Sequence, residues 1–155
     1  MSKKTTPIKR VEALKELSRD HYHGLLLCWK IRQGIKTKVS VERIKKYLDW
    51  FWLNHLKEHF RIEEELLFPI LGNDNENCKK AISEHKRLKS LFENKSHLSK
   101  TFVSIEDELE KHIRFEERIL FNEIQQKASE QELATVLKAH NTKFFDTWTD
   151  EFWKN

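Results

Sequence analysis

Glycine and proline are scarce in this chain, which has three glycines and two prolines among 155 residues. So few glycines cannot supply the many tight turns of a β-sandwich or a β-barrel. They also cannot build a phosphate-binding loop, and neither G-x-G-x-x-G nor G-x-x-x-x-G-K occurs. The chain is rich instead in apolar (38%) and charged (35%) residues, a composition typical of long helices with one buried stripe and a charged outer face. At this length we expect one all-α domain over residues 1–155.

Long apolar runs and paired cysteines are also missing. The longest apolar runs, 25–29 and 66–71, are far shorter than the roughly 20 residues that a membrane-spanning helix needs. The N-terminus carries charge without the apolar core of a signal peptide. The two cysteines, Cys28 and Cys78, form no C-x-x-C pair and no disulfide framework. We therefore expect a reduced, cytoplasmic protein that does not associate with membranes.

Most of the chain does not concentrate charge of one sign, although the formal net charge is +4. Lysine and arginine alternate with aspartate and glutamate along most of the sequence. The one acid-free basic stretch is the N-terminal segment 1–10, which we interpret as a solvated tail. No nucleic-acid-binding motif accompanies it, so we expect no nucleic-acid partner.

Helix-start and helix-stop signals divide the sequence into five segments. Gly34 is placed to end the first helix, Ser40 to begin the second, and Pro69 to stop it. Ser129 and Glu132 form a capping box before the fifth. The expected helices cover approximately residues 9–33, 41–68, 77–96, 100–125 and 130–153.

The first four segments predict an antiparallel, up-down four-helix bundle over about residues 10–125, because long helices joined by short connections pack this way. An additional C-terminal helix is expected over about residues 130–153. Five aromatic residues gather near its end: Phe144, Phe145, Trp148, Phe152 and Trp153. They indicate that this helix packs across the bundle or, alternatively, forms a homodimer contact.

Polar residues interrupt the buried stripes of the four bundle helices at regular positions. The interruptions are His21, His59, Glu63, His85, His112 and Glu116. Burying an imidazole or a carboxylate without a partner costs on the order of a few kcal/mol, and an isolated charge costs far more. A cation in the middle of the bundle would satisfy all six, which makes them the candidate metal ligands.

The second and fourth helices also contain an internal repeat. HFRIEEELLFP at 59–69 aligns without a gap with HIRFEERILFN at 112–122, which lies 53 residues later. In both copies the histidine and the first glutamate are four residues apart, so they share one helix face. Two helices that offer His plus Glu and two that offer a single His suit a dinuclear site. Such mixed ligands favour iron, manganese or zinc, because calcium and magnesium prefer oxygen ligands alone.

These motifs resemble those of the hemerythrin family, specifically the hemerythrin-like domains named for their His-His-Glu cation-binding pattern. The resemblance rests on DH at 20–21, HFRIEE at 59–64, EHKRL at 84–88 and HIRFEE at 112–117, and it covers about residues 10–125. It implies an up-down four-helix bundle around a non-haem di-iron centre. The implied roles are terminal ligands for His21 and His85, further histidine ligands for His59 and His112, and carboxylate bridges for Glu63 and Glu116.

The chain departs from the oxygen-carrying hemerythrins in its third helix. Those proteins have a second histidine one turn before or after the third-helix ligand, where this chain has Ala81 and Lys89. One iron would therefore have fewer imidazoles, and water or a substitute residue would fill the gap. The fourth-helix carboxylate of the family can also lie five residues after the histidine, so Glu117 is an alternative to Glu116.

Several further polar residues lie near the predicted ligands. His55 lies one turn before the predicted ligand His59, on the same helix face. Three interpretations of it stay open: an extra ligand, a hydrogen-bond partner of a ligand, or a polar residue near the mouth of the bundle. His23 lies about 160° of arc away from its neighbouring ligand, and we expect it to be solvated or to support a ligand. Glu64 is expected to orient the site or to form surface ion pairs. His140 shares the apolar face of the last helix, so we expect it to pack.

The resemblance implies a protein that binds oxygen or a related small molecule, because family members bind oxygen reversibly or act in oxygen, nitric-oxide or iron sensing and storage. We therefore expect a carrier, sensor or scavenger. A di-iron oxidase or peroxidase is an alternative, although no acid–base residue or reducible group for turnover stands out. A third hypothesis is a regulatory module in which metal binding orders the bundle and the aromatic C-terminal helix meets a partner.

Overall fold

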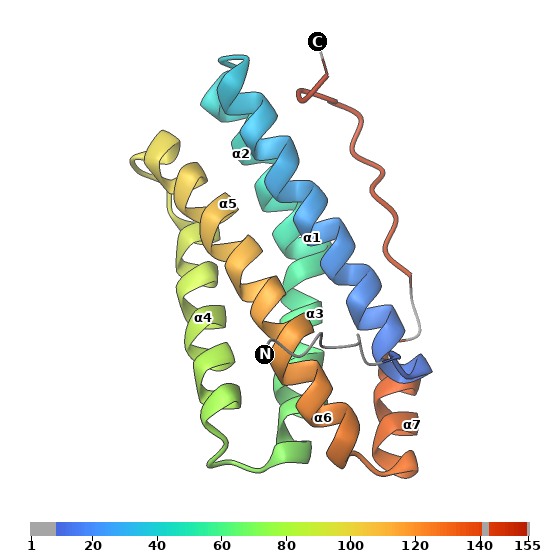
Figure 1. The fold of residues 1–155 in the computed structure, drawn as a ribbon. Helices are drawn as coiled ribbons and strands as arrows, with labels where there is room; N and C mark the ends of the chain where they lie inside the picture. The colour runs from blue at the N-terminus through green and yellow to red at the C-terminus, as the bar shows by residue number, and fades with distance from the viewer. Residues whose placement is uncertain (1–8, 141–142, 155) are drawn as a thin grey trace, which may run out of the picture.

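The computed structural model describes residues 9–140 and 143–154, and within these residues it is all-α, with no strand (Figure 1). The expected helices appear as helical rods, and a rod here means one helix or two helices that follow each other along one axis. The rods are, in order, α1; α2 continued by α3; α4; α5 continued by α6; and α7. The bounds are Glu12–Lys36 (α1), Val41–Phe51 (α2), Lys57–Ile62 (α3), Glu76–Glu93 (α4), Leu98–Phe115 (α5), Phe121–Lys127 (α6) and Glu130–Ala139 (α7). None of the helices described is long and apolar enough to cross a membrane.

Successive rods run in opposite directions, which confirms the antiparallel up-down bundle (Figure 1). The connection from α1 to α2 and the connection from α4 to α5 lie at the same end. The shorter α7 lies at the other end, against α1. Each rod thus has one face turned to the centre of the bundle, as the apolar stripes predict.

The second and fourth rods contain three five-residue π-helical turns. These turns are Trp52–Leu56, Glu63–Leu67 and Glu116–Leu120. The last two occupy corresponding positions of the internal repeat, and each begins at the glutamate that follows the histidine by four residues. Single π-helical turns are frequent at functional sites. The repeat in sequence is therefore also a repeat in backbone geometry.

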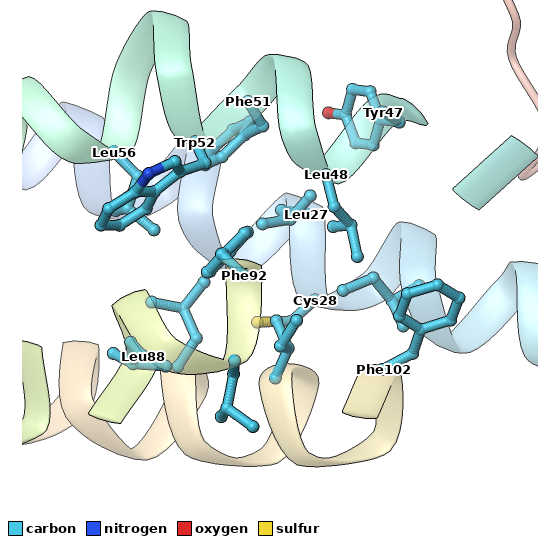
Figure 2. Close-up of a cluster of buried hydrophobic side chains, with 14 of the residues drawn as sticks. Leu27, Cys28, Tyr47, Leu48, Phe51, Trp52, Leu56, Leu88, Phe92 and Phe102 are labelled. Atoms are coloured by element: carbon cyan, nitrogen blue, oxygen red, sulfur yellow. The ribbon is translucent and has the colours of Figure 1, made fainter. Parts of the chain in front are cut away.

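The apolar core consists of two parts with the polar residues between them. The upper core, near the α1–α2 connection, includes Leu27, Cys28, Tyr47, Phe51, Phe92 and Phe102 (Figure 2). The lower core includes Leu14, Leu17, Leu67, Leu120 and Phe121. On α1, for example, His21 lies between Leu17 of the lower core and Leu27 of the upper core. The polar layer is therefore enclosed by apolar side chains above and below.

The last helix is shorter than the sequence pattern predicts. A helix over about 130–153 was the expectation, but α7 ends at Ala139, and residues 143–154 form no helix (Figure 1). They lie against α1 and α2, extended over 143–151 and with a turn at 152–153. We call this segment the C-terminal strap. An extended residue advances about 3.3 Å and a helical one about 1.5 Å, so the same residues as a helix would reach less than half as far. The extended form lets the strap cover a longer strip of the bundle.

The strap is held to the bundle by its aromatic side chains and by a partly buried ion pair. The aromatic residues Phe144, Trp148, Phe152 and Trp153 pack around Tyr47 and its neighbours. The ammonium of Lys30 lies 2.8 Å from Asp146 Oδ2 and 3.9 Å from the centre of the Trp153 ring. Intramolecular packing, the first of the two alternatives, is thus what these side chains show. Phe145 is 71% exposed, and a homodimer contact there stays a prediction.

The capping box that begins α7 gives a first testable prediction. The Ser129 hydroxyl accepts a hydrogen bond from the Glu132 backbone N–H, and the Glu132 carboxylate accepts one from the Ser129 N–H. Ser129→Ala should lower the free energy of unfolding by about 1 kcal/mol, because it leaves a helix-terminal donor without a partner. Urea unfolding followed by circular dichroism measures this loss. Ser40→Ala is the matched control, since Ser40 begins α2 without a side-chain capping bond. Equal losses in the two variants would contradict the role of the box.

Candidate metal centre

Six polar side chains meet in the layer between the two halves of the core. His21 comes from the middle of α1, His59 from α3, His85 from α4 and His112 from the end of α5. Glu63 and Glu116 each occupy the first position of a π-helical turn. All six are buried, and the two glutamates have no exposed surface. The structure thus brings together all six residues that interrupt the buried stripes in the sequence.

The histidines form two clusters that share the two glutamates. The first cluster contains His21 and His59, and the second contains His85 and His112. In each cluster one atom from each histidine and from both glutamates lies within 4.8 Å of the others. Two overlapping His/Glu groups of this kind suggest a binuclear metal site.

Each glutamate turns one oxygen toward each cluster. Oε2 of Glu63 is 3.1 Å from His59 Nε2, and its Oε1 is 3.0 Å from His85 Nε2. Oε1 of Glu116 is 2.8 Å from His21 Nε2, and its Oε2 is 3.1 Å from His112 Nε2. This is the arrangement that two carboxylates need to bridge two cations.

A second set of carboxylates contacts the outer nitrogen, Nδ1, of every imidazole. The pairs are Asp20 with His59 (2.8 Å), Glu64 with His85 (2.7 Å), Glu84 with His112 (2.7 Å) and Glu117 with His21 (2.6 Å). An Nδ1–H that donates to a carboxylate fixes the ring orientation and leaves Nε2 to carry the lone pair. All four Nε2 atoms face the centre, as metal-ligating imidazoles do.

These outer carboxylates form a ring around the bundle. Each one is adjacent in sequence to a residue of the centre, yet it contacts the histidine of the next rod. The carboxylate of α1 contacts the histidine of α3, and that of the second rod contacts the histidine of α4. The carboxylate of α4 contacts the histidine of α5, and that of the fourth rod contacts the histidine of α1, which closes the ring. Each imidazole is therefore oriented by a neighbouring rod and not by its own.

Comparison with protein families supports the same reading of the centre. The sequence model of the hemerythrin HHE cation binding domain matches residues 8–98, which is more than half of the chain. The chain belongs to the hemerythrin HHE family. The matched part of this hemerythrin domain contains His21, His59, Glu63 and His85, and the second copy of the repeat follows it. Comparisons with curated proteins and with solved structures found no match.

The chemistry of the donor atoms shows that this hemerythrin domain fits a pair of cations. Burial alone would raise the pKa of Glu116, but the facing imidazoles hold it well below its ordinary value. Burial alone would lower the pKa of His59, but the nearby carboxylates raise it to about 9. The buried atoms without a hydrogen-bond partner include both oxygens of Glu63, Oε2 of Glu116, and Nε2 of His85 and His112. Orphaned polar atoms around a shared centre are costly unless a cation joins them.

Residues that the sequence left open lie outside the two clusters. Glu117, the alternative to Glu116, contacts the outer nitrogen of His21. His55 stacks on Phe144, with its Nε2 3.5 Å from the Asp20 carbonyl oxygen, and His23 is half-buried with its edge toward Phe144. None of these belongs to either group of candidate ligands in the HHE domain.

One polar contact near the centre was not expected. His140 packs as predicted, with a side chain that is 7% exposed, but its Nε2 also lies 2.6 Å from Asp20 Oδ2. Its apolar surroundings on the helix face hid this polar contact. The outer role of Asp20 and Glu84 was also missed, although both directly precede a histidine. A residue next to a ligand is rotated by about 100° on the helix, which points it toward the neighbouring rod. That offset was the available signal.

The outer carboxylates lead to a second prediction. Glu84→Gln should weaken metal binding by about 10-fold to 100-fold, because His112 loses the charged acceptor that fixes its ring. The measurement is competition with a chelator of known affinity. Glu108→Gln on the adjacent rod is the control, since Glu108 forms an exposed ion pair with Arg87. Unchanged affinity in Glu84→Gln would mean that the contact with His112 is an ordinary ion pair.

Proposed function

We propose that this hemerythrin domain holds two non-haem iron ions and binds oxygen or a related small molecule, as a sensor, carrier or scavenger. The proposed ligands are His21, His59, Glu63, His85, His112 and Glu116. The observation that carries the proposal is the pair of glutamates, each with one oxygen on each histidine cluster. Buried carboxylates between two imidazole pairs have no comparable role in a purely structural core.

The donor set favours iron, manganese or zinc over calcium and magnesium. Imidazole and carboxylate together suit iron, manganese and zinc, whereas calcium and magnesium prefer oxygen ligands. Di-iron carboxylate bundles use inward-facing glutamates and histidines from four helices in the same way. Manganese and zinc remain alternatives that metal analysis distinguishes. An iron pair, when bound, supplies exchangeable positions and redox chemistry that no side chain of this protein offers.

The number of protein donors supports binding of a small molecule. Each cluster offers two imidazoles and two carboxylate oxygens, which is fewer than the six donors of an octahedral site. The positions at which oxygen carriers have a further histidine add no donor, because Ala81 is a buried methyl group and Lys89 is exposed. Both clusters thus leave room for a ligand from solution.

Aromatic side chains around the clusters keep bulk water out. Phe60 stacks on His85 with 3.8 Å between ring centres, and Phe121 stacks on His21 at 5.0 Å. Phe68 lies on His85 at 5.7 Å. An apolar sheath around an open coordination position favours binding of small, weakly polar molecules and limits side reactions with water. The chain's free thiols, Cys28 and Cys78, are buried and suit the reducing, cytoplasmic setting that we propose.

One preparation tests the proposal. The purified protein is reconstituted with ferrous iron without oxygen, its iron is counted, and its ultraviolet–visible spectrum is recorded before and after oxygen and then after peroxide. We expect about two irons per chain and an absorption band that appears with oxygen and disappears on its removal. Fewer than about one metal per chain would overturn the dinuclear site. Steady consumption of peroxide would indicate that the protein is a peroxidase and not an oxygen-binding protein.

A further inference from the structure

The C-terminal strap is attached to the same side of the bundle as the first histidine cluster. Lys30 of α1 bonds to Asp146 of the strap at 2.8 Å, and the guanidinium of Arg43 on α2 donates to Asp150 at 3.0 Å. Figure 1 shows the strap running beside α1, and the contact of Trp148 with Tyr47 places it against α2 as well. Because the Lys30 ammonium is buried, loss of its carboxylate partner would leave a charge without a counterion. These contacts fix where the strap lies.

His140 directly follows α7 and contacts the centre through Asp20. Oδ2 of Asp20 lies 2.8 Å from His59 Nδ1 and 2.6 Å from His140 Nε2. One carboxylate oxygen thus accepts two imidazole N–H groups. Burial alone would raise the pKa of Asp20, but these hydrogen bonds from His140 and His59 hold it far below its ordinary value.

Asp20 differs from the other three outer carboxylates in this respect. Glu117 accepts hydrogen bonds from the Ser18 hydroxyl and from the Arg10 guanidinium, and the Glu84 carboxylate lies near the Lys80 ammonium. Those supporting residues belong to the bundle rods or lie just before α1. Among the residues that the structure describes, Asp20 is the only one of the four outer carboxylates with a hydrogen bond to a residue that follows the four-helix bundle, namely His140. The first cluster is therefore the one whose orientation depends on the C-terminal part of the chain.

A cavity lies beside the contact between His140 and Asp20. It has a volume of about 460 Å³, and its lining includes Asp20, His55, His59, His140 and Phe144. Side chains of the bundle and of the strap both contribute to the lining. Without the His140 imidazole, water from this cavity can reach Asp20 and compete with the His59 N–H for the carboxylate.

We infer that His140 is a positioning residue which holds Asp20 against His59, so that metal affinity at the first cluster depends on docking of the C-terminal part of the chain: α7 through His140, and the strap through Phe144, which stacks on His55 beside Asp20. The inference rests on the proposed function, because it concerns the same centre. It assigns no metal contact to His140, which acts through Asp20 and His59. Undocking of the strap would then weaken one cluster and spare the other, which offers a path from a partner of the strap to the metal centre.

The experiment uses the full chain loaded with Co²⁺ as a paramagnetic probe. Exchangeable Nδ1–H protons of cobalt-bound imidazoles give shifted proton NMR signals that vanish in deuterated water, one for each of the four ligating histidines. His140→Phe keeps a ring of similar size but removes the donor. We expect it to move the His59 signal most and to speed cobalt release from the first cluster by about tenfold. His140→Gln should restore both, since its amide N–H reaches about as far as Nε2.

Two further variants separate positioning from a general loss of stability. Asp146→Asn, which weakens strap docking at Lys30 without touching the clusters, should speed release from the first cluster in the same direction. His97→Asn is the control, because His97 is exposed and its left-handed backbone (φ of 50°) suits asparagine. It should leave both clusters unchanged.

The outcomes are distinct. Wild-type release rates and an unmoved His59 signal in His140→Phe would overturn the inference, and so would equal weakening of both clusters that His140→Gln does not restore. Failure of the wild-type chain to bind about two Co²⁺ ions would instead overturn the proposed function itself.

Discussion

Glu63→Ala should remove both metal ions from the protein, and not only one. Each oxygen of Glu63 faces a different histidine cluster, so the truncation takes one donor from each. Each cluster would then keep two imidazoles and a single carboxylate oxygen. A metal at a thousandfold excess over its Kd stabilises the folded state by about 4 kcal/mol per site. The variant should therefore bind less than about one metal per chain, and its thermal midpoint should no longer rise when metal is added.

Metal analysis and calorimetry with and without metal measure these two effects. Glu65→Ala is the matched control, because Glu65 lies two residues further along the same rod in an exposed ion pair with Arg61. It should bind metal as the wild type does. His85→Ala gives an informative contrast, since it takes a donor from the second cluster alone and should reduce metal content by about half. Two tightly bound ions in Glu63→Ala would contradict the bridging role.

The metal-free form should lose stability as pH rises above about 6.5, whereas the metal-loaded form should keep its stability. In the metal-free protein the carboxylates raise the pKa of His59 to about 9, and they raise the pKa of His21 and His85 well above its ordinary value. The folded state therefore binds protons that the unfolded state has already lost above about pH 6.5. Stability from these ion pairs is fully present below that pH and is lost as pH rises through the folded pKa. The shift of His59 alone corresponds to roughly 3 kcal/mol.

Metal binding removes this trend, because a metal must displace the imidazole proton and the loaded folded state then binds no more of these protons than the unfolded state does above about pH 6.5. Affinity should rise with pH between about 6.5 and 9, with protons released into the buffer during binding. Urea unfolding of the two forms across this range is the measurement, together with calorimetry in buffers of different ionisation enthalpy. We expect the two stability curves to separate steadily as pH increases. Parallel curves would mean that the imidazoles of the metal-free protein are neutral at pH 7.

Much of the centre could be predicted from the sequence, because buried positions recur along the sequence with the period of the helix. A bundle helix presents a residue to the core every three or four positions, and His21, His85 and the two repeat copies interrupt that period where Leu or Ile belongs. The interruptions pointed to the six residues that the structure gathers. The capping box at Ser129 was equally local and is confirmed.

The remaining features depend on contacts between distant parts of the chain. The pairing of Asp20 with His59, or of Glu117 with His21, is set by the rotation of one rod against the next, which no local spacing records. The aromatic residues of the strap are compatible with a helical stripe and with an extended chain alike. Tertiary contacts, above all the partly buried Lys30–Asp146 pair, decide for the extended form. The contact of His140 with Asp20 was missed for the same reason.

The shared glutamates make the centre a cross-link between two helical hairpins. The first hairpin, from α1 to α3, carries His21 and His59, and the second, from α4 to α6, carries His85 and His112. Each cluster draws its two imidazoles from one hairpin and one of its carboxylates from the other. A pair of cations would tie the hairpins together as a covalent bridge would, although with bonds that a chelator can open. We therefore expect metal loss to loosen the seam between the hairpins before it unravels either of them.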